Sequence, residues 1–158
     1  MTRTADLYDQ YGDRLEVAAP MLRDFGGAPC FSGEIATVKV FEDNTLVRSQ
    51  LETEGAGRVL VVDGGGSLRC ALVGDQIGAL AADNGWSGIV VNGCIRDSLQ
   101  LAELPIGIMA LAACPAKSVK RGEGQTQVSV RFADISFVPG HYLWADHDGI
   151  AVAACALI

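Results

Sequence analysis

Two short apolar runs constrain the fold of this chain most strongly. Residues 59–62 read VLVV and residues 89–91 read IVV, with no alternation between apolar and polar positions. Continuous runs of this kind are typical of strands buried on both faces, in a sheet with other elements packed against it. Between the two runs, Ile77, Leu80 and Ala81 are spaced as one face of a helix. The pattern predicts a strand, a helix and a second strand, which is a building unit of α/β domains.

Residues 73–97 (VGDQIGALAADNGWSGIVVNGCIRD) are the most informative stretch of the sequence. The predicted helix begins at Gly74-Asp75, and the second apolar run is followed directly by Arg96-Asp97. Ligands of α/β proteins commonly bind beyond the carboxyl ends of the strands. We therefore expect the start of the helix and the Arg-Asp pair to face one crevice.

The remaining elements are expected to be short. We expect helical structure in residues 1–24, with one apolar face over residues 5–11 and another over residues 17–22. Strands are expected at residues 34–40, 68–73, 106–112, 127–132, 135–138, 142–144 and 149–153, and short helices after Asp43-Asn44 and at residues 98–104. Neither a repeat nor a break in composition divides the chain. Residues 1–158 are thus predicted to form one compact α/β domain with a mixed, barrel-like sheet and flanking helices.

Charge and composition argue against several classes of protein. The formal net charge of the 158 residues is -7, whereas a nucleic-acid binder normally carries a basic patch. No apolar run approaches the roughly 20 residues that a membrane-spanning helix needs, and the first residues lack the apolar segment of a signal peptide. The five widely spaced cysteines are expected to be free thiols. We therefore expect a cytoplasmic protein that binds neither nucleic acid nor a membrane directly.

The helix start and the Arg-Asp pair could together bind a small 2-oxo acid. The first amides of a helix are unpaired and lie at the positive end of its dipole, so they can hold a carboxylate. Those amides belong to Gly74, Asp75, Gln76 and Ile77. The planar guanidinium of Arg96 matches a carboxylate, and Asp97 is an oxygen ligand that suits Mg²⁺. From the residues alone, a surface ion pair and a helix cap formed by Asp75 are the simpler interpretation.

Three other motifs are weaker candidates. The turn at residues 63–67 (DGGGS) could bind phosphate, but it lacks the Gly-Lys of a P-loop, and Arg69 stands where a dinucleotide fingerprint needs glycine. Close backbone packing is the simpler role for its glycines. His141 and His147 have no third ligand at zinc-site spacing. Residues 146–149 (DHDG) resemble part of a calcium loop without its glutamate, which favours a β-turn.

A nucleophilic thiol and a basic loop remain. Cys94 lies close to Arg96 in the sequence but has no neighbouring histidine, so a small core residue is the default interpretation. Lys117, Lys120 and Arg121 are most simply part of a solvated loop. They could also neutralise an anionic substrate or partner.

Several segments together resemble one protein family, which contains the regulator of ribonuclease activity A and the class II 4-hydroxy-4-methyl-2-oxoglutarate aldolases. The segments are FGG at 25–27, VFEDN at 40–44, VLVVDGGGS at 59–67, Gly74-Asp75 and Arg96-Asp97. The resemblance covers about residues 5–152. In the aldolase branch, twenty residues separate the Gly-Asp turn from the Arg-Asp pair, and residues 76–95 provide the same spacing here.

This resemblance implies a swivelling β/β/α fold and a divalent-metal-dependent lyase. Such an enzyme would cleave 4-hydroxy-4-methyl-2-oxoglutarate to pyruvate, decarboxylate oxaloacetate, or do both, through a pyruvate enolate. By the same resemblance, the amides of residues 74–77 and Arg96 hold the pyruvoyl group, and Asp97 holds Mg²⁺ or Mn²⁺ largely through water. The side chain of Asp75 would shape and cap the helix. A homotrimer, sometimes paired into a hexamer, with the site between subunits is also implied.

The sequence departs from the aldolase pattern at two places, and the resemblance also allows an alternative function. The longer aldolases carry a C-terminal extension that lends an acidic residue to a neighbouring site, and nothing here matches it. Where the family has a Gly-Asp pair before one of its last strands, this chain has Gly140-His141. The alternative is a non-enzymatic regulator that binds and inhibits the RNA-decay endonuclease ribonuclease E, a partner type that acidity suits. By the same resemblance, the best-known form of the regulator lacks the Arg-Asp pair. The presence of Arg96-Asp97 in this chain therefore favours the enzyme.

Overall fold

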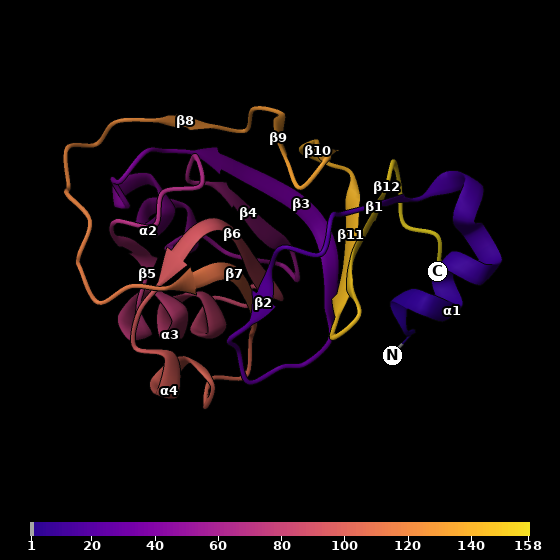
Figure 1. The fold of residues 1–158 in the computed structure, drawn as a ribbon, viewed down its shortest axis with the longest axis horizontal. Helices are drawn as coiled ribbons and strands as arrows, with labels where there is room; N and C mark the ends of the chain where they lie inside the picture. The colour runs from indigo at the N-terminus through magenta and orange to yellow at the C-terminus, as the bar shows by residue number, and fades with distance from the viewer. Residues whose placement is uncertain (1) are drawn as a thin grey trace.

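The two apolar runs lie side by side as parallel strands. β4 (Val59–Asp63) pairs with β6 (Gly88–Ile95), and every residue of both strands is buried. β3 (Phe31–Lys39) pairs with the outer side of β4, and β7 (Gly107–Ala113) with the outer side of β6, both in parallel. The computed structural model, which describes residues 2–158, thus places these strands at the centre of the sheet (Figure 1).

Antiparallel strands complete the sheet and make it curl. Residues 31–34 of β3 pair with β11 (Tyr142–Asp146), whereas residues 35–39 pair with β4. β11 forms a hairpin with β12 (Gly149–Ala153) around the predicted turn. The edges and additions are β1 (Glu16–Val17) on β12, β2 (Arg23–Asp24) on β7, β5 (Ala71–Val73) on β6, and β8 (Gln125–Thr126) on β3. The predicted mixed, barrel-like α/β fold is confirmed.

The two faces of the sheet are covered by different elements. One face packs against α2 (Thr45–Leu51), α3 (Asp75–Asp83) and α4 (Ser98–Leu101), which appear together on one side of the molecule (Figure 1). Their buried apolar side chains are Val47, Leu51, Ile77, Ala81 and Leu101. The other face packs against the hairpin of β9 (Val130–Phe132) and β10 (Ile135–Phe137). This double coverage explains why the central strands are apolar on both faces.

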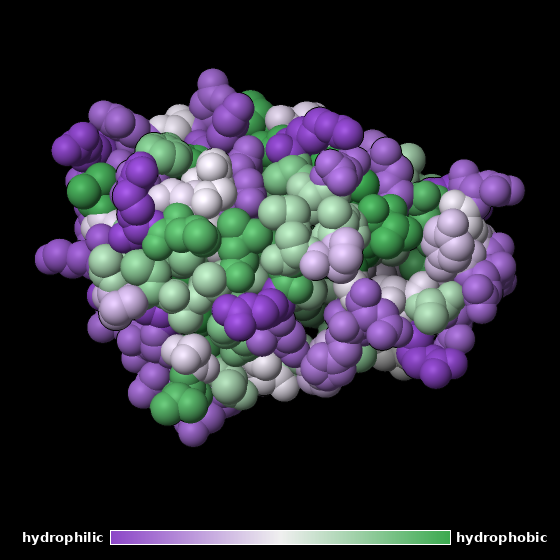
Figure 2. Space-filling view, viewed as in Figure 1, coloured by the Kyte–Doolittle hydropathy of each residue, from purple (hydrophilic) through white to green (hydrophobic). Residues whose placement is uncertain are grey.

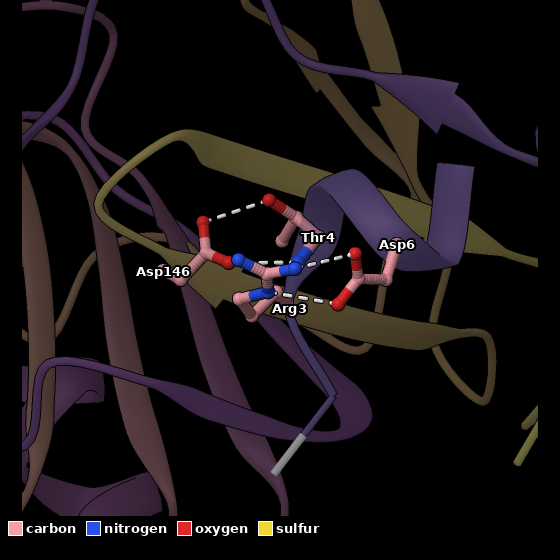
Figure 3. A network of polar contacts seen from close by, with 4 residues as sticks. All are labelled: Arg3, Thr4, Asp6 and Asp146. Atoms are coloured by element: carbon pink, nitrogen blue, oxygen red, sulfur yellow. Dashed lines mark hydrogen bonds and ion pairs between the residues drawn. The ribbon is translucent and has the colours of Figure 1, made fainter. Parts of the chain in front are cut away.

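The first helix lies outside the sheet, beyond the β11–β12 hairpin (Figure 1). α1 (Thr4–Tyr11) is followed by a single 3-10 turn, η1 (Gly12–Arg14). Figure 3 shows the attachment of α1: the buried Asp146 carboxylate accepts hydrogen bonds of 2.7 Å from both the backbone N–H and the hydroxyl of Thr4. Leu7 packs in a small apolar cluster beside the hairpin. One buried carboxylate and one apolar contact thus hold α1 in place.

One predicted region is partly wrong. Helix α1 was expected, but the second helical face, over residues 17–22, does not exist. Val17 lies instead in edge strand β1, and the N–H of Ala18 donates to the carbonyl of Ile150. Pro20 explains the difference, because proline cannot donate the backbone hydrogen bond of a helix interior. No helix within residues 2–158 is both long enough and apolar enough to cross a membrane.

Candidate active site

All six predicted site residues meet in one pocket beyond the carboxyl ends of the parallel strands. The pocket has a volume of about 180 Å³. Its walls come from the starts of α2 and α3, from β5, from the turn after β6, and from the loop after β7. The predicted residues among its walls are Gly74, Asp75, Gln76, Ile77, Arg96 and Asp97.

The start of α3 already has a carboxylate against it. Asp97 Oδ2 accepts a hydrogen bond of 3.1 Å from the N–H of Asp75. The carboxylate of Asp75 accepts a 2.8 Å hydrogen bond from the N–H of Gln76. Asp75 therefore shapes the first turn of its own helix, and the side chain facing the helix start from outside is that of Asp97.

The backbone at Asp97 directs this contact. Asp97 adopts the left-handed conformation (φ 56°, ψ 44°), which is uncommon outside glycine but is tolerated best by aspartate and asparagine. Arg96 is fixed just before it, because its N–H donates to the carbonyl of Val73 on β5 at 2.9 Å. A Cβ atom added to Gly74 would lie 2.8 Å from Asp97 Oδ2. Gly74 thus allows the close approach of the Asp97 carboxylate, which a side chain at this position would push aside.

The pocket holds more positive than negative side chains. Arg48 of α2, Arg96, and Lys117 and Lys120 of the loop after β7 line it, against the two carboxylates of residues 75 and 97. Lys120 Nζ donates a 3.2 Å hydrogen bond to Asn44 Oδ1. This excess of positive charge favours an anionic ligand.

A buried carboxylate holds the lysine-bearing loop beside the pocket. Asp43 accepts hydrogen bonds from the N–H and hydroxyl of Thr45 and from the backbone amides of Arg121 and Glu123. Burial by itself raises the pKa of Asp43, but these hydrogen bonds outweigh it and lower the pKa to about 2. Both lysines at positions 117 and 120 are exposed, as expected for a loop. They nevertheless line the pocket, so a purely solvated loop is not a full description.

Three further polar residues of the pocket were missed from the sequence. Asn44 could have been found, because it belongs to the VFEDN segment that carries the family resemblance. Arg48 follows one helical turn later and so shares its face of α2. Ser118 gave no signal, because nothing in the sequence distinguishes this buried serine from others.

The donor set of the pocket fits a hydrated magnesium or manganese ion. Within residues 2–158 there is no group of three or more histidine, cysteine or acidic side chains arranged to hold a metal. Mg²⁺ usually keeps several waters and needs only one or two carboxylates, which Asp75 and Asp97 can supply. Among the described residues, none donates a hydrogen bond to Asp97 Oδ1, so this oxygen is available to a hydrated cation.

The competing motifs do not contribute to the pocket. In the DGGGS turn, the amides of Gly64 and Gly66 donate to the carbonyl of Asn92 at 3.0 and 3.1 Å, so the turn packs closely on β6. Cys94 is only 1% exposed, and burial raises the pKa of its thiol, which opposes formation of a nucleophilic thiolate. Neither histidine lines the pocket.

Comparisons with known proteins connect this geometry to a family. A family model described as "RraA-like: Aldolase/RraA" matches residues 2–152. A relative from Laribacter hongkongensis (strain HLHK9), named "putative 4-hydroxy-4-methyl-2-oxoglutarate aldolase", is 57% identical over 98% of this chain and 98% of its own length. Further relatives with this name are 49–55% identical.

Two solved structures share the fold at high identity. The RNA-processing inhibitor RraA from Thermus thermophilis is 46% identical, with a TM-score of 0.96 over 100% of this chain and 96% of that one. A structure named S-adenosylmethionine:2-dimethylmenaquinone methyltransferase, from Geobacillus kaustophilus, is 49% identical, with a TM-score of 0.97 over 99% and 97%. These names differ from one another, so the choice of reaction depends on the chemistry of the pocket.

The match is nearly complete in both directions. The Laribacter relative, named a putative aldolase, aligns over 155 residues that cover 98% of this chain and 98% of its own length. Because the family model spans residues 2–152 and the relatives align over almost their whole length, this chain belongs to the RraA-like family, described as Aldolase/RraA.

Proposed function

We propose that this protein is a divalent-metal-dependent lyase that releases pyruvate from a 2-oxo acid. It would cleave 4-hydroxy-4-methyl-2-oxoglutarate, decarboxylate oxaloacetate, or catalyse both reactions through a pyruvate enolate. The observation that carries this proposal is that Arg96, Asp97 and the start of α3 line one pocket with an excess of positive charge. Relatives named as aldolases at 49–57% identity support the same reaction class.

The pyruvoyl end of the substrate binds at the start of α3. Its carboxylate binds the amides at the helix start, where the dipole is positive, and replaces Asp97 at the amide of Asp75. Arg96 donates to the 2-oxo oxygen, and the carboxylate of Asp97 would hold Mg²⁺ or Mn²⁺ largely through water. When bound, the ion polarises the 2-oxo carbonyl as a Lewis acid.

Arg96 would act on the charge that develops in the transition state. As the carbon–carbon bond breaks, negative charge grows on the 2-oxo oxygen, and a fixed guanidinium stabilises that charge more than it stabilises the ground state. Decarboxylation of oxaloacetate needs no base, because the leaving carboxylate supplies the electron pair. Aldol cleavage requires a base for the C4 hydroxyl proton, and a water molecule is the candidate. Decarboxylation is therefore the less demanding reaction.

Pyruvate release from oxaloacetate tests the proposal. The purified protein is assayed with Mg²⁺ or Mn²⁺, with and without a chelator, against the rate of the metal alone. We expect release that depends on metal and falls sharply in Arg96→Ala. Arg131→Ala is the matched control, since this arginine contacts Ser136 and Asp134 on the β9–β10 hairpin, outside the pocket. The proposal would be contradicted by pyruvate release above the background that is unchanged both by the chelator and by Arg96→Ala.

A second candidate function is inhibition of ribonuclease E by direct binding. Two observations favour it: 46% identity to the RNA-processing inhibitor RraA of Thermus thermophilis, and a net charge of -7, which suits a basic partner surface. A pull-down with the basic scaffold region of the endonuclease tests this. Absence of binding at micromolar concentration would count against the regulator.

We further propose that the chain assembles as a homotrimer, or as a hexamer of two trimers, in the reducing cytoplasm. Large apolar side chains are exposed at Phe41, Leu68 and Val119, at 58%, 59% and 45%, and the face seen in Figure 2 gathers hydrophobic residues across its middle. Such surfaces commonly mark interfaces. The five free cysteines among the described residues fit a reducing compartment. Light scattering would measure the assembled mass against the 16.6 kDa chain.

A further inference from the structure

Arg48 is a pocket cation that binding of the pyruvoyl group leaves without a role. It lies on α2, on the wall that also carries Asn44, whereas the pyruvoyl group would bind at α3 and Arg96. Lys120 is already engaged by Asn44. The guanidinium of Arg48 has one partner within residues 2–158, the carboxylate of Glu52, through Nε at 3.1 Å.

The contact with Glu52 orients Arg48 without using its full binding capacity. Nε is engaged, and neither Nη group donates to another part of the described chain. Arginine binds carboxylates through a planar fork, so the free Nη groups can still bind a planar anion. The Arg48 side chain is 47% exposed, so a ligand can reach it. Glu52 lies one turn further along the helix and fixes the direction of the fork.

Arg48 and the start of α3 line the same pocket from two helices, so they could bind the two ends of one ligand. α2 packs beside α3, and the pocket lies between their starts. A 2-oxo acid whose carboxylate binds the amides of residues 74–77 therefore extends its other end away from α3. If that end carries a second carboxylate, Arg48 of α2 is the guanidinium, besides Arg96, that lines the pocket and can bind it. Lys117 adds positive charge from its loop, but as a point charge on an exposed, flexible stem.

We propose that Arg48 is a specificity-determining residue that binds the distal carboxylate of 2-oxo dicarboxylates and so discriminates them from 2-oxo monocarboxylates. The assignment of the pyruvoyl end to α3 and Arg96 depends on the proposed function. The role of Arg48 is an addition to it, since a pyruvate-forming site could work without distal recognition.

A pair of non-reacting probes tests Arg48 directly. 2-Oxoglutarate and 2-oxobutyrate differ by the terminal carboxylate, and neither has the 3-carboxylate that oxaloacetate loses. By calorimetry in the presence of Mg²⁺, Arg48→Gln should weaken 2-oxoglutarate binding about tenfold, as expected for a lost charge-assisted hydrogen bond. Binding of 2-oxobutyrate should change less than about twofold. Arg48→Lys should recover part of the loss.

Matched variants separate this contact from a general charge effect. Arg131→Gln removes the same charge from the β9–β10 hairpin and should change neither affinity. Lys117→Gln tests the neighbouring cation and should cost less than Arg48→Gln. In turnover, Arg48→Gln should raise KM for oxaloacetate about tenfold while kcat falls much less and inhibition by pyruvate stays the same.

The outcomes distinguish this proposal from the lyase proposal. Equal weakening of both probes by Arg48→Gln, a loss confined to Lys117→Gln, or no measurable binding of 2-oxoglutarate to the wild type would each overturn the role of Arg48. If oxaloacetate is not turned over but Arg48→Gln still selectively weakens 2-oxoglutarate, the lyase proposal fails and the role of Arg48 stands.

Discussion

Two helices of this protein begin against an aspartate carboxylate from a distant strand, and the two contacts differ in strength. At α1, Asp146 from the end of β11 accepts two hydrogen bonds of 2.7 Å from Thr4. At α3, Asp97 from the end of β6 accepts one hydrogen bond of 3.1 Å from Asp75. Asp146 is buried, and Asp97 is exposed in the pocket.

The difference shows how one local arrangement can serve as an anchor or as a binding site. Burial raises the pKa of Asp146, but hydrogen bonds from Thr4, Asp148 and Gly149 outweigh it, so the pKa is lowered and the carboxylate stays charged and satisfied. A carboxylate with a single long hydrogen bond, as at Asp97, is exchanged at little cost for a ligand or drawn to a cation. The start of α1 is therefore an anchor, and the start of α3 is a surface that can bind an anion.

Removing the cation beside the exposed carboxylate should have a large effect on activity. We expect Arg96→Gln to lower kcat/KM for pyruvate release about 100-fold, by analogy with the loss of one preorganised donor to a developing oxyanion. The melting temperature should hardly change, because Arg96 is exposed and its backbone N–H still pairs with β5. A large fall in melting temperature with an unchanged rate would show that the residue is structural.

At the anchor, the same kind of change should affect stability and leave activity intact. Asp146→Ala leaves the N–H and hydroxyl of Thr4 without their partner, and we expect a loss of about 3 kcal/mol in unfolding free energy. Urea denaturation measures the loss, and pyruvate release per folded molecule should be unchanged. Asp6→Ala is the control: its ion pair with Arg3 is exposed, so no measurable destabilisation is expected.

Acid should weaken the carboxylate that holds the lysine loop. The pKa of Asp43 in the folded protein is about 2, below its ordinary value of 3.8, so its stabilisation is complete above pH 4 and is lost as the pH falls through 2. The loss should approach about 2 kcal/mol. Asp146 adds to it in the same direction.

The pH dependence is measured by urea denaturation at several pH values between 5 and 2. Asp43→Asn should be less stable than the wild type at neutral pH and should lose less stability on acidification. Parallel curves for the two proteins would refute the role of this carboxylate.

The smallest effect should come from crowding the Asp97 carboxylate without removing it. In Gly74→Ala the new Cβ would lie 2.8 Å from Asp97 Oδ2, so the flexible side chain moves aside. Because Asp97 is the proposed metal ligand, misplacing its carboxylate should cost about tenfold in activity, with little change in melting temperature. Gly12→Ala, whose Cβ would meet Tyr8 at 3.5 Å or more, is the control. Full activity in Gly74→Ala would mean that the position of Asp97 is not critical.

Local patterns in the sequence predicted the centre of the fold. Strands β4 and β6 and helix α3 follow from runs of adjacent apolar residues and from helical spacing, which depend on neighbours in the sequence. The edge strand at Val17 was missed because its pairing with Ala151 is set by the distant hairpin. Local reasoning also gave too little weight to Pro20, which excludes a regular helix there.

For the pocket, sequence reasoning reached one wall and missed the other. The α3 wall was predictable because Gly74-Asp75 stands at the start of α3 and Arg96-Asp97 directly follows the next strand, β6. Arg48 joins them only through the packing of α2 beside α3, which no spacing encodes. The lysine loop reaches the pocket because Asp43 accepts the amide of Arg121, 78 residues away in the sequence. The hydrogen bond from the Asp75 amide to the Asp97 carboxylate was likewise not predicted, because it depends on the left-handed backbone conformation of Asp97.

One assay tests most directly whether the exposed carboxylate of Asp97 is required for activity. Pyruvate release from oxaloacetate is measured for the wild type and Asp97→Ala at saturating Mg²⁺ or Mn²⁺, with the metal-only rate subtracted. We expect release by Asp97→Ala to fall to the background while the protein remains folded. Equal release above the background by the two proteins would contradict it.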